Sequence, residues 1–370
     1  MPKIRVFLAD DAMVVRRILT DTLASDPDIE VVGTAPNGKI ALAKLAQLNP
    51  DLVILDVEMP EMDGLETLKE IRKTQRLLPV IMFSTLTQRG AAATLDALSA
   101  GASDYVTKPA NVGSVSAAMQ TIRETLIPKI KLFTRRGTTF DPAALALKKP
   151  LLVTTSARST RLSERVEILA IGTSTGGPDA LNSLLIQLPA DFPVPVLIVQ
   201  HMPPMFTNLL AERLNSHCAI TVTEATSGML LEPGKAWVAP GDFHLGLERT
   251  DDKLYTRVFV GPPENSCRPA VDVMLRSVAQ HFGGGCLTVI LTGMGQDGLR
   301  GCEAVSSAGG QIVVQDEASS VVWGMPGFVA QAGLASHVLP LDEIASEVLR
   351  RVMRGRVRST LGSRSLGAAA

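Results

Sequence analysis

Short apolar runs alternate with segments of helical periodicity along most of the chain, in two separate stretches. Between residues 3 and 122 the strand-like runs are Ile4–Leu8, Val31–Val32, Leu52–Leu55, Val80–Phe83 and Tyr105–Val106. The segments between them repeat apolar residues every three or four positions, which is typical of helices with one buried face. Parallel strands connected by such helices form a doubly wound sheet. The first stretch is therefore predicted to be an α/β domain.

The second stretch, residues 167–349, repeats the alternation on a larger scale. Its predicted strands are Ile168–Ile171, Val194–Val199, Ala236–Ala239, Leu287–Leu291 and Ile312–Val314. Its predicted helices are Asp179–Leu188, Phe206–Asn215, Pro269–Phe282, Gly298–Ser307 and Leu341–Val352. A second α/β fold with a doubly wound parallel sheet is the expectation.

The rest of the chain separates and follows these domains. Residues 124–166 are rich in Lys, Arg, Ser, Thr and Pro, which indicates a basic flexible linker. Residues 353–370 are small, polar and basic, which is typical of a disordered tail. The predicted domains are thus residues 1–123 and 167–352.

Charge and cysteine content narrow the class of protein. The formal net charge of −1 argues against a nucleic-acid binder, and the four cysteines form no C-x-x-C pair that would indicate zinc or a disulfide framework. The N-terminus leads directly into a strand, which predicts no signal peptide, and no apolar run is long enough for membrane insertion. A cytoplasmic location is expected.

Polar side chains gather where the predicted strands of the first domain end. Asp10 and Asp11 follow the first strand, Asp56 ends the third, Ser84 ends the fourth, and Lys108 follows the fifth. Each has an ordinary explanation as a cap or loop residue. Together they lie at one edge of the sheet, where clustered carboxylates suit Mg²⁺ and a lysine can offset the charge of a phosphoryl group.

These residues stand in motifs that resemble a response-regulator receiver domain. The match covers residues 3 to about 122, with Asp10-Asp11, Leu55-Asp56-Val57-Glu58-Met59-Pro60, Asp63-Gly64, Ser84-Thr85 and Lys108-Pro109. The resemblance implies a flavodoxin-like fold, phosphorylation of Asp56 by a histidine kinase, and Mg²⁺ held by Asp10, Asp11 and Asp56. It also implies that Lys108 contacts the phosphate and that Ser84 and Tyr105 are the switch pair.

In the second domain, Gly172-Thr173-Ser174-Thr175-Gly176-Gly177 follows a predicted strand and precedes a predicted helix. A serine on such a corner has an exposed hydroxyl beside the unpaired N–H groups of the helix start. This arrangement favours a nucleophile for acyl transfer. A glycine-rich anion site and a plain turn with a capping serine remain alternatives at this point.

A serine nucleophile needs a base and a carboxylate that orients it. His201 follows the strand that ends at Gln200, so it shares the strand-end edge with Ser174, and His244 is the rival. His217 and His281 fall at helix ends, and His337 is expected in the core. Asp297 follows another strand, with Asp316 as the competing acid. The order Ser, His, Asp differs from the common order Ser, Asp or Glu, His of α/β-hydrolases, so the Gly-x-Ser-x-Gly match does not indicate membership of that fold.

Five segments of the second domain resemble the CheB family of chemotaxis protein-glutamate methylesterases. They are Ile171–Pro178, Val199–Pro203, Ser266–Val273, Leu291–Gly298 and Trp323–Pro326, and the match spans about residues 167–349. The resemblance implies an α/β/α domain with the triad Ser174, His201 and Asp297, with Thr175 and Met294 lining the oxyanion site. No cofactor is implied in this domain.

The same resemblance implies what the whole chain does. Phosphorylation relieves blocking of the esterase by the receiver, and the enzyme demethylates glutamate γ-methyl esters, and deamidates glutamines, on methyl-accepting chemoreceptors. A monomer is the family default. Three rivals remain: a receiver joined to a serine hydrolase for other substrates, a DNA-binding response regulator, and a non-catalytic scaffold. Against the DNA-binding response regulator, residues 167–349 show no basic helix-turn-helix.

Overall fold

The computed structural model describes residues 2–109, 114–134, 165–354 and 356. The chain divides into two compact units between Arg158 and Ser159. That division falls within residues 135–164, which lie outside the described part of the chain together with 355 and 357–370. Most of the predicted linker and tail therefore lies outside it as well.

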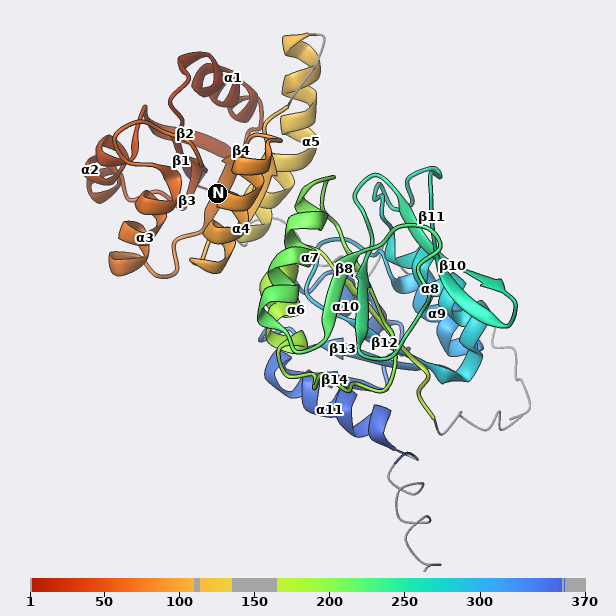
Figure 1. Ribbon diagram of the computed structural model, residues 1–370. Helices are drawn as coiled ribbons and strands as arrows, with labels where there is room; N and C mark the ends of the chain where they lie inside the picture. The colour runs from red at the N-terminus through yellow and green to blue at the C-terminus, as the bar shows by residue number, and fades with distance from the viewer. Residues whose placement is uncertain (1, 110–113, 135–164, 355, 357–370) are drawn as a thin grey trace, which may run out of the picture. The chain divides into compact units, whose positions relative to one another are not determined.

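The first unit is a five-stranded sheet with helices on both faces (Figure 1). The strand order is β2-β1-β3-β4-β5, and every pair is parallel. Its elements are β1 (Ile4–Ala9), α1 (Met13–Ala24), β2 (Ile29–Ala35), α2 (Gly38–Leu48), β3 (Leu52–Asp56), α3 (Gly64–Thr74), β4 (Val80–Ser84), α4 (Gln88–Ser99), β5 (Asp104–Thr107) and α5 (Val115–Phe133).

Alternation along the strands divides the core of this unit between the two faces of the sheet. In β1, Val6 and Leu8 pack in the cluster that includes α1 and α5 residues, whereas Phe7 and Ala9 pack in the cluster that includes α2 and α3 residues. Successive side chains of a strand point to opposite faces, so a strand covered on both sides is apolar throughout. The predicted doubly wound sheet is confirmed.

The last helix of the first unit extends further than the sequence suggested. The predicted linker starts at residue 124, but α5 continues to Phe133. Leu126, Ile127 and Ile130 are buried in the core cluster of α1 and β1. The boundary expected at residue 123 thus cuts through a packed helix, because basic residues such as Lys129 and Lys131 gave the segment the composition of a linker.

The second unit has a seven-stranded sheet in the order β14-β13-β12-β6-β7-β9-β8, again with every pair parallel. Helices α6, α7 and α11 pack together, and α8, α9 and α10 pack with the other face (Figure 1). Its elements are β6 (Ile168–Thr173), α6 (Gly177–Leu185), β7 (Val196–Gln200), α7 (Phe206–His217), β8 (Thr221–Glu224), β9 (Lys235–Val238), β10 (His244–Thr250), β11 (Lys253–Phe259), α8 (Val271–Phe282), a 3₁₀ turn η1 (Gly283–Gly285), β12 (Cys286–Ile290), α9 (Leu299–Ser307), β13 (Gln311–Gln315), α10 (Met325–Gln331), β14 (His337–Leu339) and α11 (Leu341–Met353).

The sequence pattern did not predict several strands of this unit. Strands β8 and β14 are short edge strands without an apolar run. The antiparallel hairpin β10–β11 carries exposed charged residues such as Glu248 and Arg257. His337, expected in the core, is exposed, because β14 lies at the edge of the sheet.

Both sheets place polar residues at the point where the strand order reverses. In the first unit β1 lies between β2 and β3, and in the second β6 lies between β12 and β7. The connections leave such neighbouring strands in opposite directions, which opens a crevice at their carboxyl ends. Asp10 and Asp56 lie at this edge in the first unit, and Ser174 and His201 lie there in the second.

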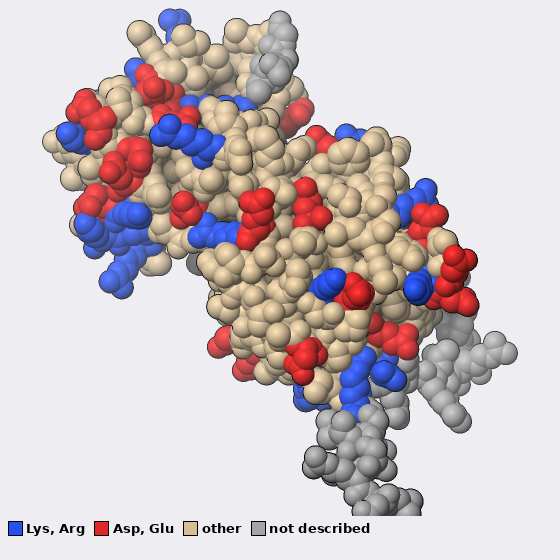
Figure 2. Space-filling model, in the orientation of Figure 1, with Lys and Arg blue, Asp and Glu red and all other residues tan. Residues whose placement is uncertain are grey.

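The surface carries charges of both signs. On the face shown in Figure 2, Lys and Arg side chains alternate with Asp and Glu over each unit rather than forming a patch of one sign. Such a face lacks the basic stripe that tracks a nucleic-acid backbone. None of the helices in the described residues combines the length and apolar character needed to span a bilayer.

Candidate active site and acidic cluster

Three carboxylates and a lysine meet at the carboxyl edge of the first sheet. Asp10 and Asp56 are each 1% exposed. The Lys108 Nζ atom lies 2.8 Å from Oδ2 of Asp10 and 2.8 Å from Oδ2 of Asp56. The ligand oxygens of Asp10, Asp11 and Asp56 lie within 4.8 Å of one another. The sequence predicted that these side chains would share one edge, and the structure brings them together.

The electrostatics of this cluster suit a bound cation. Burial and the charge of Asp10 raise the pKa of Asp56 to about 6, although Lys108 opposes the shift. Buried carboxylates that repel one another are relieved by a hard cation with oxygen ligands, and Mg²⁺ prefers such ligands. The donor set therefore fits Mg²⁺.

The two other residues predicted for this domain lie on neighbouring strands. Ser84, the last residue of β4, is fully buried, and its hydroxyl donates to the carbonyl oxygen of Gly90 at 3.1 Å. The backbone N–H of Lys108 donates to the carbonyl oxygen of Ser84 at 2.7 Å. Tyr105 lies on β5, opposite Met82 of β4. Ser84 is thus linked directly to the lysine that contacts Asp56.

In the second unit, Ser174 occupies a tight corner between β6 and α6. Its N–H donates to the carbonyl oxygen of Thr292, and its own carbonyl oxygen accepts from the N–H of Gly177 and from Nε2 of Gln200, at 2.8 and 2.9 Å. A side chain at Gly293 would lie 2.9 Å from Cβ of Ser174, so only glycine allows this approach. Backbone hydrogen bonds hold this corner, so the Ser174 hydroxyl is not needed to stabilise it.

Strand register brings His201 next to Ser174. Thr173 pairs with Gln200 in the parallel strands β6 and β7, and each candidate residue is the next one along its strand. The N–H of His201 donates to the carbonyl oxygen of Thr173 at 3.2 Å. Ser174 and His201, which were expected to meet at one edge of the sheet, therefore follow paired residues of two adjacent strands.

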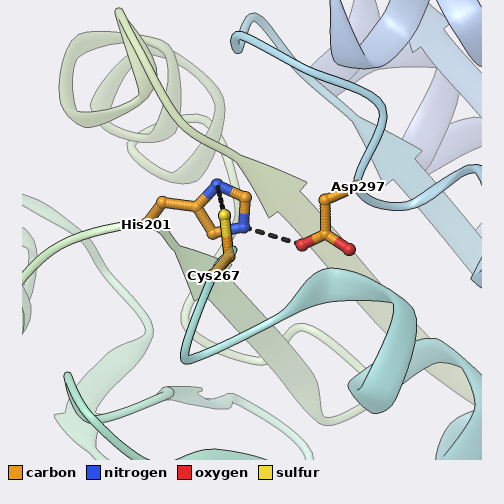
Figure 3. Close-up of side chains that lie close together, drawn as sticks. All are labelled: His201, Cys267 and Asp297. Carbon is orange, nitrogen blue, oxygen red and sulfur yellow. Dashed lines mark hydrogen bonds and ion pairs between the residues drawn. The ribbon is translucent and has the colours of Figure 1, made fainter. Parts of the chain in front are cut away.

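Asp297 completes a hydrogen-bonded pair with the imidazole. Its Oδ2 atom lies 2.8 Å from Nε2 of His201 (Figure 3) and also accepts the N–H of Val271 at 2.6 Å. Its Oδ1 atom accepts the N–H groups of Asp272 and Gly298. The start of α8 thus holds this carboxylate with its N–H groups, where the helix dipole favours negative charge.

This pairing shifts the pKa values of both His201 and Asp297. Burial alone would lower the pKa of His201, but the hydrogen bonds to Asp297 and Cys267 outweigh it and hold that pKa above its ordinary value. Burial alone would raise the pKa of Asp297, but His201 and the N–H groups at the start of α8 hold it below its ordinary value. The carboxylate is therefore ionised, and it stabilises the imidazolium that forms when the ring takes a proton.

The rival base and acid have other roles. His244 is 1% exposed, and its Nδ1 accepts the N–H of Ala270 while Nε2 donates to the carbonyl oxygen of Pro262. Both ring nitrogens are used, so the residue is structural. Asp316 accepts from the N–H and hydroxyl of Ser319, which closes a turn after β13.

Sequence reasoning missed two neighbours of the pair. Nδ2 of Asn265 donates both to Oδ1 of Asp297, at 3.0 Å, and to Oδ2 of Asp272, at 2.9 Å. Asp272 also accepts the N–H groups of Gly298 and Gly301. Asp272 lies in the segment Ser266–Val273, which carries part of the resemblance described above, and Asn265 immediately precedes that segment. Proximity to the segment was therefore the signal that could have identified both residues.

Cys267 is the third missed neighbour, and it lies against the imidazole ring of His201 (Figure 3). Its Sγ atom lies 3.6 Å from Nδ1 of His201 (Figure 3). Among the described residues the Ser174 hydroxyl makes no hydrogen bond to this imidazole. Such bonds are often long before substrate binds and tighten in the complex. The structure thus bonds the backbone of His201 to Thr173, the residue before Ser174, and the expected side-chain hydrogen bond between Ser174 and His201 is not made.

The residues predicted to line an oxyanion site flank Ser174. Thr175 is buried, and its carbonyl oxygen accepts from the hydroxyl of Thr292. Met294 is 40% exposed and follows Gly293, which packs against Ser174. Helix α6 begins at Gly177 with no side-chain cap, the N–H of Gly177 donates to the carbonyl oxygen of Ser174, and Pro178 has no N–H.

Two protein families match the chain. The family described as response regulator receiver domain matches residues 6–120, and the family described as CheB methylesterase matches residues 169–348. The catalytic domain of the Thermotoga maritima CheB methylesterase has a solved structure that is 42% identical, covering 50% of this chain and 98% of that one, with a TM-score of 0.49.

Curated relatives match over nearly the whole length. A protein of Trichodesmium erythraeum is 55% identical over 95% of this chain and 100% of its own. A protein of a Nocardioides species is 54% identical over 96% of this chain and 97% of its own. Both carry the name protein-glutamate methylesterase/protein-glutamine glutaminase.

Proposed function

The chain belongs to the CheB methylesterase family, with a response regulator receiver domain ahead of the esterase domain, and we propose that it hydrolyses glutamate γ-methyl esters of chemoreceptors through Ser174, His201 and Asp297. The observation that carries this assignment is the 2.8 Å bond between His201 and Asp297, at a strand end one residue beyond the pair Thr173–Gln200. It supports a base that is oriented and set beside the serine corner.

The proposed reaction begins with attack of the Ser174 hydroxyl on the ester carbonyl. Asp297 accepts from Nε2 of His201, so the neutral ring has its lone pair on Nδ1. Nδ1 takes the serine proton as the new C–O bond forms, and Asp297 stabilises the resulting imidazolium. N–H groups near Thr175 and Met294 are proposed to hold the oxyanion, and each such donor contributes about 3–4 kcal/mol in related chemistry.

Collapse of the tetrahedral intermediate breaks the bond to the methoxy group, which leaves as methanol with the proton from His201. Water then attacks the acyl-enzyme, gives a proton to the same nitrogen, and releases the glutamate carboxylate and Ser174. A glutamine side chain enters the same sequence with ammonia as leaving group, because both substrates pass through one tetrahedral oxyanion. This accounts for a glutaminase activity at the same site.

Regulation is proposed to begin at Asp56. Its carboxylate is the acceptor, Lys108 offsets the charge of the incoming phosphoryl group, and Asp10, Asp11 and Asp56 would hold Mg²⁺. Bound there, the cation supplies charge neutralisation for phosphoryl transfer. The bond from Lys108 to Ser84 gives the event a path to the switch pair Ser84 and Tyr105. A histidine kinase is the proposed donor, and the enzyme is proposed to act as a cytoplasmic monomer.

Substitution of Asp56 by alanine is expected to abolish activation by an acyl phosphate and to leave the unstimulated rate of hydrolysis in place. The variant has no carboxylate to phosphorylate, while the esterase unit has its own core. The matched control is Glu70→Ala, an exposed carboxylate near the far end of α3. Stimulation of the Asp56 variant equal to that of the control would show that another residue accepts the phosphoryl group.

The direct test is methanol release from receptor membranes that carry methylated glutamates, with the full chain and an acyl phosphate. Methanol above the no-enzyme rate is the expected result. Receptors with alanine at the methylated positions serve as the control substrate. A chain that cleaves simple esters but releases no methanol from receptors would be a serine hydrolase with another substrate, and a gel shift with DNA would support the transcriptional alternative.

A further inference from the structure

The segment before α8 reverses direction in a tight two-residue hairpin. The backbone N–H of Glu264 donates to the carbonyl oxygen of Cys267 at 3.0 Å, and the reverse bond is 2.9 Å long. The two residues between them, Asn265 and Ser266, have φ values of 51° and 62°. A type I′ turn requires positive φ at both positions, and asparagine adopts it more readily than most residues. The hairpin therefore fixes where the Asn265 side chain leaves the backbone.

An ion pair anchors this hairpin to α8. The guanidinium of Arg276 donates two hydrogen bonds to the carboxylate of Glu264, at 2.7 and 2.5 Å. A bidentate pair of this kind is directional as well as charged. At the other end of the turn, Cys267 lies against the imidazole of His201 (Figure 3). The hairpin is thus fixed to the helix whose first turn holds Asp297.

The Asn265 amide supplies a hydrogen to each of two buried carboxylates. Its Nδ2 atom lies 3.0 Å from Oδ1 of Asp297 and 2.9 Å from Oδ2 of Asp272. An amide NH₂ group has two hydrogens, so it can serve both oxygens at once. The N–H of Gly298 also lies 3.0 Å from an oxygen of each carboxylate, but it has one hydrogen to divide between them. Asn265 is therefore a donor that this backbone group does not replace.

Hydrogen bonds decide how the Asp297 carboxylate is turned. Rotation about the Cβ–Cγ bond of an aspartate has no steep preference of its own. Oδ2 must face Nε2 of His201, and Oδ1 points away from the ring (Figure 3). The backbone donors to Oδ1 belong to Asp272, at the start of α8, and to Gly298, the residue after Asp297. Asn265 adds a donor to Oδ1 from a third segment, and thereby keeps Oδ2 turned to the histidine.

We propose that Asn265 is a positioning residue of the hydrolase, which holds Oδ1 of Asp297 so that Oδ2 stays aligned with Nε2 of His201. The proposal rests on the triad of the proposed function. Because the side chain acts through Asp297, its loss should slow the chemical step rather than weaken substrate binding. Displacement of a catalytic group by about 1 Å can lower the rate by about a hundredfold.

Two variants remove the donor and keep the turn. Asn265→Gly removes the whole amide, and glycine adopts positive φ without strain. Asn265→Asp keeps the shape of the side chain but replaces the NH₂ group with a carboxylate oxygen. Ser266→Gly is the matched control, because it is the same change at the other central residue of the hairpin. All three positions are exposed, so the melting temperatures of the full-length chains should stay close to that of the parent.

The first readout follows the bond itself and does not use activity. The proton between Nε2 of His201 and Asp297 should give a low-field resonance in the ¹H NMR spectrum of the full chain, and His201→Gln should remove it. Both Asn265 variants should shift or broaden this resonance, whereas Ser266→Gly should leave it in place. An unchanged resonance in the Asn265 variants, an equal change in Ser266→Gly, or a parent chain without the resonance overturns the proposal.

The second readout separates positioning from substrate binding. On methylated receptors, Asn265→Gly should lower kcat by about ten- to a hundredfold and leave KM within about twofold of the parent value. Ser266→Gly should match the parent in both constants. A rise in KM at constant kcat would make Asn265 a substrate contact and contradict the proposal. A parent chain that releases no methanol, but whose resonance shifts only in the Asn265 variants, would refute the esterase assignment and leave the positioning role standing.

Discussion

Replacement of Ser174 by alanine is expected to lower methanol release by about 10⁵–10⁶-fold, to the level that binding and oxyanion stabilisation alone sustain. The variant loses the only atom that can form the acyl-enzyme in the proposed mechanism. His201 and Asp297 cannot compensate, because a base without its nucleophile can only activate water in a site shaped for serine. The measurement is kcat on methylated receptors, with and without phosphodonor.

The loss should not come from unfolding. The structural bonds of Ser174 use its backbone: the N–H donates to Thr292, and the carbonyl oxygen accepts from Gly177 and Gln200. Alanine preserves all of them, so the melting temperature should stay close to that of the parent chain. Ser183→Ala, on the following helix, is the matched control and should keep full activity. Retention of more than a few per cent of the rate by a folded Ser174→Ala chain would remove this residue as nucleophile.

Replacement of Asp297 by asparagine is expected to lower kcat by about 10⁴-fold. Both carboxylate oxygens accept from N–H donors, namely Val271 and His201 at Oδ2, and Asp272, Gly298 and Asn265 at Oδ1. An amide NH₂ in either position meets donors instead of acceptors. Where it faces His201, the ring must accept at Nε2, which moves its proton to Nδ1 and removes the lone pair that serves as the base.

A buried neighbour separates this effect from simple destabilisation. Asp272 is fully buried at the start of α8 and accepts from Gly298, Gly301 and Asn265, and among the described residues it makes no hydrogen bond to His201. Asp272→Asn should lower the free energy of unfolding, as Asp297→Asn does, because both leave donors unpaired. Its kcat should fall far less. Equal losses of kcat in the two variants would mean that Asp297 acts only through the fold.

The parts of the fold that the sequence predicted are those buried on both faces. Continuous apolar runs located β1, β3, β4, β6 and β12 to within a residue or two, because a parallel strand between two helical layers tolerates few polar side chains. The elements it missed, β8, β14 and the hairpin β10–β11, lie at edges or outside the main sheet and have one exposed side. The end of α5 was misplaced because its lysines resembled the basic composition of the linker that follows, although they pair with Asp104, Asp26 and Asp28.

The candidate site divides in the same way. Residues at strand ends, Ser174, His201 and Asp56, could be located because the carboxyl edge of a parallel sheet collects them wherever they stand in the chain. Asn265 and Cys267 belong to the segment between β11 and α8, which has no periodicity that fixes its path. Their contacts with Asp297 and His201 follow from how that segment folds over the sheet edge.

The amino-acid sequence by itself determined the two α/β units and the strand-end placement of the acidic cluster and of the serine corner, because burial and strand period are local properties of the chain. The residues of the proposed triad were predicted through the resemblance to the CheB family. Only the tertiary structure decided which histidine pairs with which aspartate. His244 and Asp316 are of the same residue types, but His244 is hydrogen-bonded to Pro262 and Asp316 to Ser319. It also decided that the Cys267 thiol lies against the His201 imidazole, 3.6 Å from Nδ1. Contacts between segments far apart in sequence depend on the packing of the whole unit, which no local pattern records.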